Sequence, residues 1–404
     1  MFYKAHFCAR ISIIRCYSIN NRAFVNKHPN LSQMMKYVPK EYQKVSSKVA
    51  QEYLYLICPQ TAKIIAEHVV NSVNDNQIVA ETNVGLGLIT SELLDRGVPI
   101  VRMYESSPEF RLDLKNYDSK YQGRVELFTK NFFHLPRYST MDTLDGHNRV
   151  DSLLKNIPRR SWTDDPVMTV VGTMPNTSFI RYLIKSLALQ RGLALYGRIQ
   201  MFAILKKHHY NVLTTTPEQD LRLYQYTSIL FQLLFDYEEL ETFPRAIFLP
   251  WESVNKKKSS EEMVLVKINF KKQFEIPIDK ILHLYYFINQ FSNRGNKNFI
   301  VSTIEKWVPG CGANILVPTM KHDDYFSDIT LFTKFRELTP PQMLAIFKEM
   351  INAPSYSGSP FKDLIENELM KSETMETDLA DAISERKPKK VMEKANLDYQ
   401  DGFE

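Results

Sequence analysis

Cysteine is scarce in this 404-residue chain, and long hydrophobic runs are missing. The four cysteines (Cys8, Cys16, Cys58 and Cys311) follow no paired spacing, which argues against a disulfide framework and a zinc motif. No apolar stretch approaches the ~20 residues needed to cross a bilayer. We therefore expect a protein of a reducing compartment, with no metal site and no membrane partner.

Acidic residues are absent from the start of the chain, where the first is Glu41. The basic residues before it are Lys4, Arg10, Arg15, Arg22, Lys27, Lys36 and Lys40. A cationic, amphipathic, acid-free start is typical of a mitochondrial transit peptide, because the membrane potential draws such a helix inward. We interpret residues 1–40 as a transit peptide and basic N-terminal segment, with cleavage after Tyr17, and expect a location in the mitochondrial matrix. A disordered basic tail is the alternative.

Short apolar segments alternate with helical patterns in the first half of the chain. Strands are expected at 77–81, 99–105, 125–129, 167–172 and 193–202, and helices at 58–73, 88–94, from 108 onward and 181–190. This alternation predicts an α/β, Rossmann-like domain with a mostly parallel sheet, covering residues 41–272. The hydrophobic fraction of 44% fits a globular protein, and the net charge of +5 permits nucleic-acid binding without indicating it.

The remaining segments are less regular. The polar stretch 134–165 is interpreted as an insertion outside the core. A helix is expected at 216–235, and two further strands at 243–248 and 263–270. Apolar residues at helical spacing then predict a smaller all-α C-terminal domain at 273–356. The polar residues 357–404 are interpreted as a mobile tail.

A glycine loop and two acidic residues form the candidate cofactor site. Glu81 ends one expected strand, Gly85 and Gly87 follow it, and Glu105 ends the next strand. Glycines let the backbone approach a ligand, and an acid at the second strand end can bind ribose hydroxyls. The G-x-G-x-x-G spacing of NAD proteins is not met, because Thr90 stands at the third position, so S-adenosylmethionine is favoured. The alternative is a tight turn that binds nothing.

Several motifs resemble those of the ribosomal RNA adenine dimethyltransferases and their mitochondrial descendants, the transcription factor B proteins, over roughly residues 50–330. Residues 55–59 (YLICP) resemble F-L-x-D-P, and residues 81–90 resemble E-x-G-x-G-x-L-T with Asn83 in place of the first glycine. Residues 131–133 (NFF) resemble D-F/A-L. The resemblance implies a methyltransferase fold that binds S-adenosylmethionine through Leu56, Glu81, Gly85, Gly87, Glu105 and Asn131.

The catalytic motif departs most from the family pattern. Thr173, Met174, Pro175 and Asn176 stand where the family carries N-L-P-Y. In the family the Asn holds the target amino group and the Tyr stacks on the flipped adenine. Thr173 lacks that amide and Asn176 lacks an aromatic face, although Phe179 is a nearby ring. We therefore expect weak or no methylation and a cofactor site that is vestigial.

Basic clusters are the candidate nucleic-acid contacts. They comprise Lys206, Lys207, His208, His209 and Tyr210, the turn Lys256, Lys257 and Lys258, and the pair Lys271 and Lys272. Tyr224 and Tyr226 are candidate stacking residues. The alternative for each cluster is a solvated loop or strand end.

A presequence combined with a degenerate catalytic motif resembles the branch of the family that assists the single-subunit mitochondrial RNA polymerase in promoter melting. That resemblance implies a monomeric transcription initiation factor in the mitochondrial nucleoid, with the polymerase, promoter DNA or RNA as partners. Two other hypotheses stay open. One is an active mitochondrial small-subunit rRNA adenine dimethyltransferase, and the other is a non-catalytic RNA-binding ribosome-assembly protein.

Overall fold

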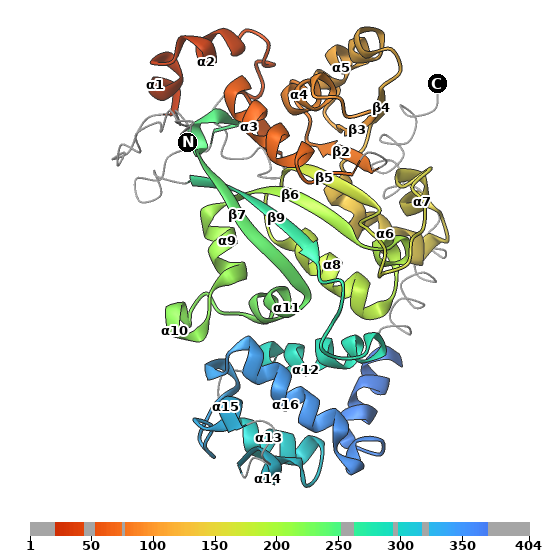
Figure 1. Ribbon diagram of the computed structural model, residues 1–404, viewed down its shortest axis with the longest axis vertical. Coiled ribbons are helices and arrows are strands. Elements are labelled where there is room, and N and C mark those ends of the chain that lie inside the picture. Colours follow the sequence, from red (N-terminus) through yellow and green to blue (C-terminus); the bar gives the residue numbers. More distant parts are fainter. Residues whose placement is uncertain are drawn as a thin grey trace, which may run out of the picture.

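The computed structural model describes residues 21–43, 53–74, 77–251, 262–293, 298–316 and 323–370. A sheet-containing body lies above a helical C-terminal region (Figure 1). The strands are β1 (Tyr55–Leu56), β2 (Ile78–Thr82), β3 (Val101–Tyr104), β4 (Val125–Phe128), β5 (Met168–Thr173), β6 (Ile199–Lys206), β7 (Phe235–Pro244), β8 (Phe248–Leu249) and β9 (Glu262–Phe270).

Seven of these strands form one sheet in the order β4-β3-β2-β5-β6-β9-β7, and β1 pairs with β8. Every neighbouring pair from β4 to β6 is parallel, whereas β9 runs antiparallel to both β6 and β7. The predicted α/β fold with a mostly parallel sheet is therefore confirmed. The strand order reverses between β2 and β5, which places a topological switch point at their carboxyl ends, the usual ligand position in such sheets.

Helices cover both faces of the sheet, so strands such as β6 are buried at every residue. The helices of the sheet-containing body are α1 (Asn21–Asn26), α2 (Pro29–Met34), α3 (Pro59–Val70), α4 (Leu88–Asp95), α5 (Pro108–Tyr121), α6 (Leu135–Asp145), α7 (Arg149–Leu153), α8 (Ser178–Leu189), α9 (Lys207–Thr214), α10 (Pro217–Asp220) and α11 (Tyr226–Leu234). Helices α1 to α4 pack in one apolar cluster, and α6, α7, α8 and α11 pack in another.

The boundary drawn at residue 40 needs correction. Val25, Leu31 and Val38 are buried in the same apolar cluster as Ile247 and Phe248. Residues 21–40 therefore belong to the folded body. The sequence pattern resembled a transit peptide because an amphipathic helical hairpin can be both basic and half apolar. The expected cleavage site after Tyr17 lies outside the described residues.

The segment 134–165 also contributes to the core, contrary to its interpretation as an insertion outside it. It forms α6 and α7, and its buried apolar residues are Leu135, Val150, Leu153, Leu154 and Ile157. Apolar residues are sparse here because each short helix buries only one narrow stripe.

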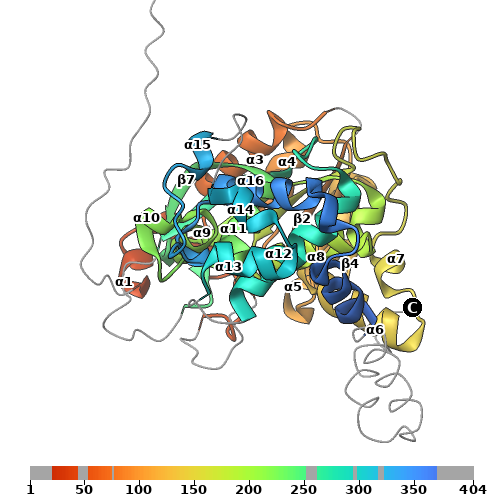
Figure 2. The same ribbon diagram turned by 90° about the horizontal axis from the view of Figure 1, so that it is seen from below.

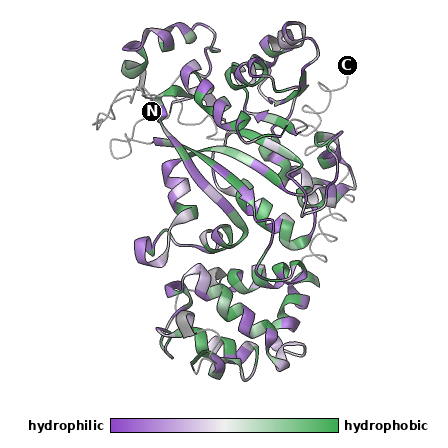
Figure 3. Cartoon of the chain, viewed as in Figure 1, coloured by the Kyte–Doolittle hydropathy of each residue, from purple (hydrophilic) through white to green (hydrophobic). Residues whose placement is uncertain are grey.

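Two predicted elements are shifted. The strand expected at 193–202 begins only at Ile199, because residues 192–196 form a 3-10 turn before it. The helix expected at 216–235 is split into α10 and α11, and the chain then enters β7 instead of the strand expected at 243–248. Strand β7 is at the sheet edge and three of its exposed positions are acidic, so much of it is purple in Figure 3. That polarity hides the strand pattern in the sequence.

The C-terminal region is helical, as predicted, apart from one bridge between Phe299 and Lys334 in its described part. Its helices are α12 (Ile281–Asn293), α13 (Ile300–Trp307), α14 (Cys311–Leu316), α15 (Asp323–Phe326) and α16 (Pro340–Asn352). Helix α12 packs on α8 and α11, and α16 packs on α11. Figure 2 shows these helices from below, and their apolar residues share one cluster with residues of β5, β6 and β9.

The prediction that a mobile tail begins at residue 357 is wrong. Residues 360–370 are helical, and Phe361 and Ile365 are buried. The ring of Phe361 lies 5.3 Å from that of Trp307, measured between centroids. The rest of the expected tail, residues 371–404, lies outside the described part of the chain.

Candidate functional site

The carboxyl ends of β2 and β5 meet at the switch point, where a hydrogen-bonded network of three substituted positions lies. Asn83 Nδ2 donates to the Thr173 carbonyl oxygen at 2.9 Å, and Asn131 Nδ2 donates to Asn83 Oδ1 at 2.9 Å. Asn131 Oδ1 in turn accepts from the Phe133 amide at 2.8 Å. All three residues are at least 94% buried. The amide that was expected to bind the adenine ring is therefore bonded within the chain.

The backbone conformation at residue 83 explains why an asparagine is tolerated there. Its φ of 56° is left-handed, a conformation in which glycine and asparagine are favoured over other residues. An asparagine can thus replace the family's glycine without distorting the turn. Its side chain then fills the space next to Asn131 and Thr173.

The degenerate catalytic motif is used structurally. The Thr173 hydroxyl donates to the Leu54 carbonyl oxygen, and Met174 is fully buried. Pro175 is half-buried. Asn176 Oδ1 accepts from the Ser178 amide at 2.8 Å at the start of α8. Asparagine is favourable in such a turn, because its side chain can bond the backbone amide two residues on. The Thr173 hydroxyl and Asn176 Oδ1 are thus both bonded to backbone groups of the chain.

Phe179 does not replace the missing aromatic ring. Its side chain is 2% exposed and packs against Phe133 with a centroid distance of 4.9 Å and against Phe132 at 5.6 Å. It belongs to the core beneath α8, because it lies on the inward face of that helix.

Glu105 follows β3 at the position expected for a ribose-binding acid, and it is fully buried. Its Oε2 accepts from the Gly85 amide at 2.9 Å, and its Oε1 accepts from the Ser107 amide at 2.7 Å and the Tyr55 hydroxyl at 3.3 Å. Burial raises the pKa of Glu105 despite these donors.

Glu81, the other expected acid, supports the helix that follows the loop. Its Oε2 accepts from the Thr90 amide at 2.7 Å and from the Thr90 hydroxyl at 2.5 Å, in the first turn of α4. Burial raises the pKa of Glu81 to about 8, and the nearby Glu105 adds to the shift. In the described part of the chain neither carboxylate is paired with a lysine or an arginine.

The two loop glycines adjoin tyrosine rings of the chain itself. A Cβ on Gly85 would lie 2.8 Å from Tyr55 Cδ1, and a Cβ on Gly87 would lie 2.6 Å from the Tyr117 hydroxyl oxygen. Both residues also have a positive φ. Glycine is therefore required here for the turn and for the close approach of these two side chains. Leu56, which the resemblance implied as a cofactor contact, is 6% exposed and packs in the apolar cluster with Phe248.

The basic cluster expected to bind nucleic acid is partly neutralised. Lys206 is 6% exposed, and Lys207 Nζ lies 2.7 Å from Glu239 Oε1 and over the Tyr210 ring. His208 and His209 are adjacent on α9 with rings 5.9 Å apart. Nucleic-acid binding by this cluster stays a prediction. Lys256, Lys257 and Lys258 lie outside the described residues.

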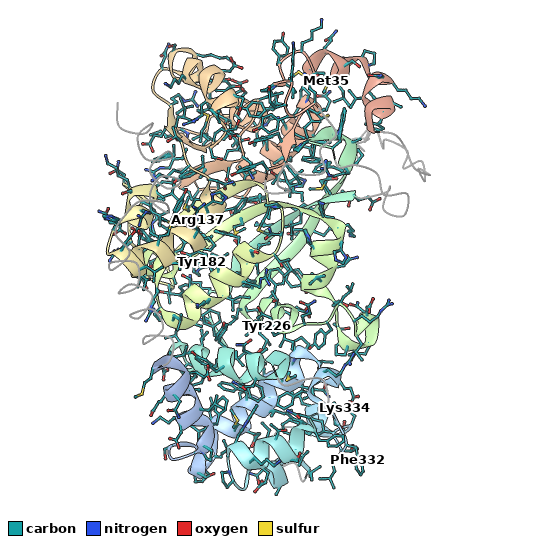
Figure 4. The ribbon with its side chains drawn as sticks, turned by 180° about the vertical axis from the view of Figure 1, so that it is seen from behind. Met35, Arg137, Tyr182, Tyr226, Phe332 and Lys334 are labelled. Atoms are coloured by element: carbon teal, nitrogen blue, oxygen red, sulfur yellow. The ribbon has the colours of Figure 1, made fainter. Side chains whose placement is uncertain are left out.

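Lys271 and the two candidate stacking tyrosines meet other parts of the fold. Lys271 Nζ donates to the Gln232 carbonyl oxygen at 3.3 Å, and Lys272 is exposed. Tyr224 is 6% exposed, and its hydroxyl donates to the Leu338 carbonyl oxygen at 2.8 Å. Figure 4 shows Tyr226 where the sheet-containing body meets the helical region, far from Phe332 and Lys334 at the other end of that region. Tyr224 is therefore a buried contact between the two regions.

Within the described ranges, no cluster of three or more His, Cys, Asp or Glu side chains has the arrangement of a metal site. The helices in that part of the chain are also too short or too polar to span a membrane.

Comparison with known proteins decides the family. The chain is 30% identical to the mitochondrial dimethyladenosine transferase 2 of Drosophila melanogaster over 350 residues, which cover 76% of this chain and 77% of the fly protein. The chain belongs to the mitochondrial dimethyladenosine transferase 2 family. The rat member of the family is 25% identical over 226 residues, or 53% of this chain and 56% of the rat protein.

Membership of the dimethyladenosine transferase 2 family confirms the resemblance to the rRNA adenine dimethyltransferases and supports a mitochondrial location. A crystal structure of the 23S rRNA methyltransferase ErmE has a TM-score of 0.48 and 17% identity, covering 73% of this chain and 99% of that protein. No protein-family model matches the chain. The sheet is the one expected for an S-adenosylmethionine-dependent methyltransferase fold.

The cofactor of such folds does not fit the residues as they are arranged here. The Glu105 carboxylate and the Asn131 amide already bond to other groups of the chain. The decisive residues, Tyr55 and Tyr117, were not identified from the sequence. Tyr55 in place of the family's Phe was the one available signal, since a tyrosine adds a hydrogen-bond donor.

Proposed function

We propose that this chain is a mitochondrial transcription initiation factor that assists the single-subunit mitochondrial RNA polymerase in promoter melting, on a scaffold that has lost methylation. In this proposal it acts as a monomer in the matrix nucleoid, and promoter DNA is its nucleic-acid partner. The S-adenosylmethionine site is vestigial.

One observation carries the proposal. Thr173 and Asn176, at the two positions that would hold the target adenine, bond to the Leu54 carbonyl oxygen and the Ser178 amide. A base-flipping enzyme needs groups that hold the amino group and stack on the ring, and stacking alone is worth about 1–3 kcal/mol. A scaffold without these groups supports a role that does not depend on methyl transfer.

Membership of the dimethyladenosine transferase 2 family and the basic start of the chain supply the biological setting. The motif resemblance implies a polymerase cofactor in the branch of the family with a degenerate catalytic motif. Activity as an rRNA dimethyltransferase is the competing function, because the rRNA adenine dimethyltransferases share the fold and the glycine loop.

Run-off transcription tests the proposal. Purified chain, the mitochondrial polymerase of the same species and its promoter-binding factors are mixed with either a duplex promoter or the same promoter carrying an unpaired bubble at the start site. Addition of the chain should raise transcript from the duplex and have little effect on the bubble template, because the bubble no longer requires melting.

A parallel methyl-transfer assay uses a small-subunit ribosomal RNA hairpin as substrate. An rRNA adenine dimethyltransferase that carries the intact N-L-P-Y motif is the positive control. This chain should remain at background. Methylation at the rate of the positive control, without stimulation of duplex transcription, would reject the proposal in favour of the enzyme.

A further inference from the structure

Most of the acceptor capacity of the Glu105 carboxylate is used within the chain. A carboxylate offers about four lone-pair positions. Here the donors are the amides of Gly85 and Ser107 and the hydroxyl of Tyr55. Because Glu105 is fully buried, no water-exposed side of the group remains for a ligand. A ribose diol donates two hydrogen bonds and needs two acceptor positions, so it can bind only by displacing one of these three donors.

Tyr55 is the donor that is most readily replaced by a ligand. The other two donors are backbone amides, one next to the carboxylate in the chain and one in the glycine loop, so they belong to the fold itself. Tyr55 contributes a side-chain hydroxyl, and its distance of 3.3 Å is the longest of the measured bonds. The family pattern has Phe at this position, which would free the acceptor position that Tyr55 occupies.

Neighbouring aromatic rings hold Tyr55 in place. Its ring centroid lies 4.6 Å from that of Phe110 and 5.1 Å from that of Tyr42. The Tyr42 hydroxyl donates to Ser107 Oγ at 3.0 Å, which ties residues near the N-terminus to the loop after β3. Tyr55 itself is 1% exposed and packs against Gly85.

We infer that the Tyr55 hydroxyl takes the place of a ribose hydroxyl on Glu105 and so excludes nucleosides with a vicinal diol from this site. Tyr55 is thus a specificity-determining residue, and Tyr42 and Phe110 position it. The network of Asn131 and Asn83 closes the adenine side of the same site in an equivalent way. This inference rests on the proposed function only in taking the cofactor site as vestigial.

Binding of S-adenosylhomocysteine to the full chain, measured by isothermal titration calorimetry, tests the inference. Wild type should show no saturable binding at millimolar ligand. Tyr55→Phe should bind at least about 10-fold more tightly, since a hydrogen bond to a charged group corresponds to roughly 10- to 100-fold in affinity. Adenosine should gain in the same way, whereas 2′,3′-dideoxyadenosine, which lacks the diol, should not.

Two further variants complete the experiment. Tyr237→Phe makes the same chemical change on β7, far from the site, and should not alter binding. The double variant Asn83→Gly with Asn131→Asp opens the adenine side, so Tyr55→Phe is also measured in that background. If circular dichroism shows that Tyr55→Phe is misfolded, Tyr42→Ala is measured instead. This variant keeps Tyr55 but removes one of the rings that hold it against Glu105, so it should also raise the affinity.

Micromolar binding by wild type, or no gain from Tyr55→Phe in both backgrounds, overturns the inference. So does an equal gain for the dideoxy ligand, because the effect would then not involve the diol. Stimulation of duplex transcription does not depend on binding of S-adenosylhomocysteine, so the two proposals fail separately. A wild-type chain that binds S-adenosylhomocysteine tightly and still stimulates duplex transcription would refute the inference alone.

Discussion

Replacement of Glu81 by Gln should change how stability depends on pH. The Glu81 carboxyl is buried, its donors are the amide and hydroxyl of Thr90, and no cation is paired with it in the described residues. A glutamine oxygen can accept the same two hydrogen bonds without the carboxyl's negative charge. Glu81→Gln should therefore keep the start of α4 intact while removing one titration.

The sign follows from the pKa of Glu81, which burial raises from 4.5 to about 8 in the folded state. Between these two values the folded chain binds the proton and the unfolded chain does not, so the free energy of unfolding of wild type falls as pH rises. The slope is about 1.4 kcal/mol per pH unit, which gives at most about 5 kcal/mol across the whole interval.

Urea unfolding followed by circular dichroism, at several values between about pH 5 and pH 8, measures this effect. The quantity of interest is the free energy of unfolding of Glu81→Gln minus that of wild type. It should increase with pH, because only wild type loses the stability that comes from the protonated Glu81 carboxyl. Glu238→Gln, an exposed carboxylate on β7, is the matched control. A difference for Glu81→Gln that stays constant over the interval would refute the reasoning.

Three other outcomes are expected. Thr173→Asn combined with Asn176→Tyr should leave methyl transfer to a ribosomal RNA hairpin at background, because the carboxyl and amide groups of the cofactor site remain bonded within the chain; robust transfer would contradict a closed site. Phe361→Ala should lower the free energy of unfolding by about 3–5 kcal/mol in urea titrations, as for other buried Phe residues, whereas a loss below about 1 kcal/mol would place residues 360–370 outside the core. A double-mutant cycle on Lys207 and Glu239, whose side chains are both 34% exposed, should give a coupling below about 1 kcal/mol, and a much larger value would mean that the pair is desolvated.

The sheet was largely predictable because buried parallel strands are short apolar runs bounded by glycine or polar residues. Strands β2 to β5 lie where such runs predict them. Strand β7 was missed because it is an edge strand, where acidic residues on exposed positions obscure the alternation. Residues 134–165 and 357–370 were underestimated because short helices bury few side chains, and those few are distant from one another in the sequence.

The backbone of the candidate site was predictable from the sequence, but the side-chain hydrogen bonds that fill it were not. The glycine loop and the two acids are local patterns that the sequence displays directly. Whether Glu105 is free or bonded depends on Tyr55, which precedes it by fifty residues and reaches it only through the packing of β1. The bond between Asn131 and Asn83 likewise joins two loops that only the folded sheet brings together. Such long-range pairings have no periodicity for a sequence pattern to detect.

The helical hairpin at residues 21–40 has a practical consequence for handling the protein. Removing the chain only up to about residue 20 would keep α1 and α2 in place. Starting it at residue 41 would uncover the apolar surface around Ile247 and Phe248 that Val25 now covers. A recombinant protein cut at that later point should therefore be prone to aggregation, and purification tags are better placed before Asn21 than in place of α1.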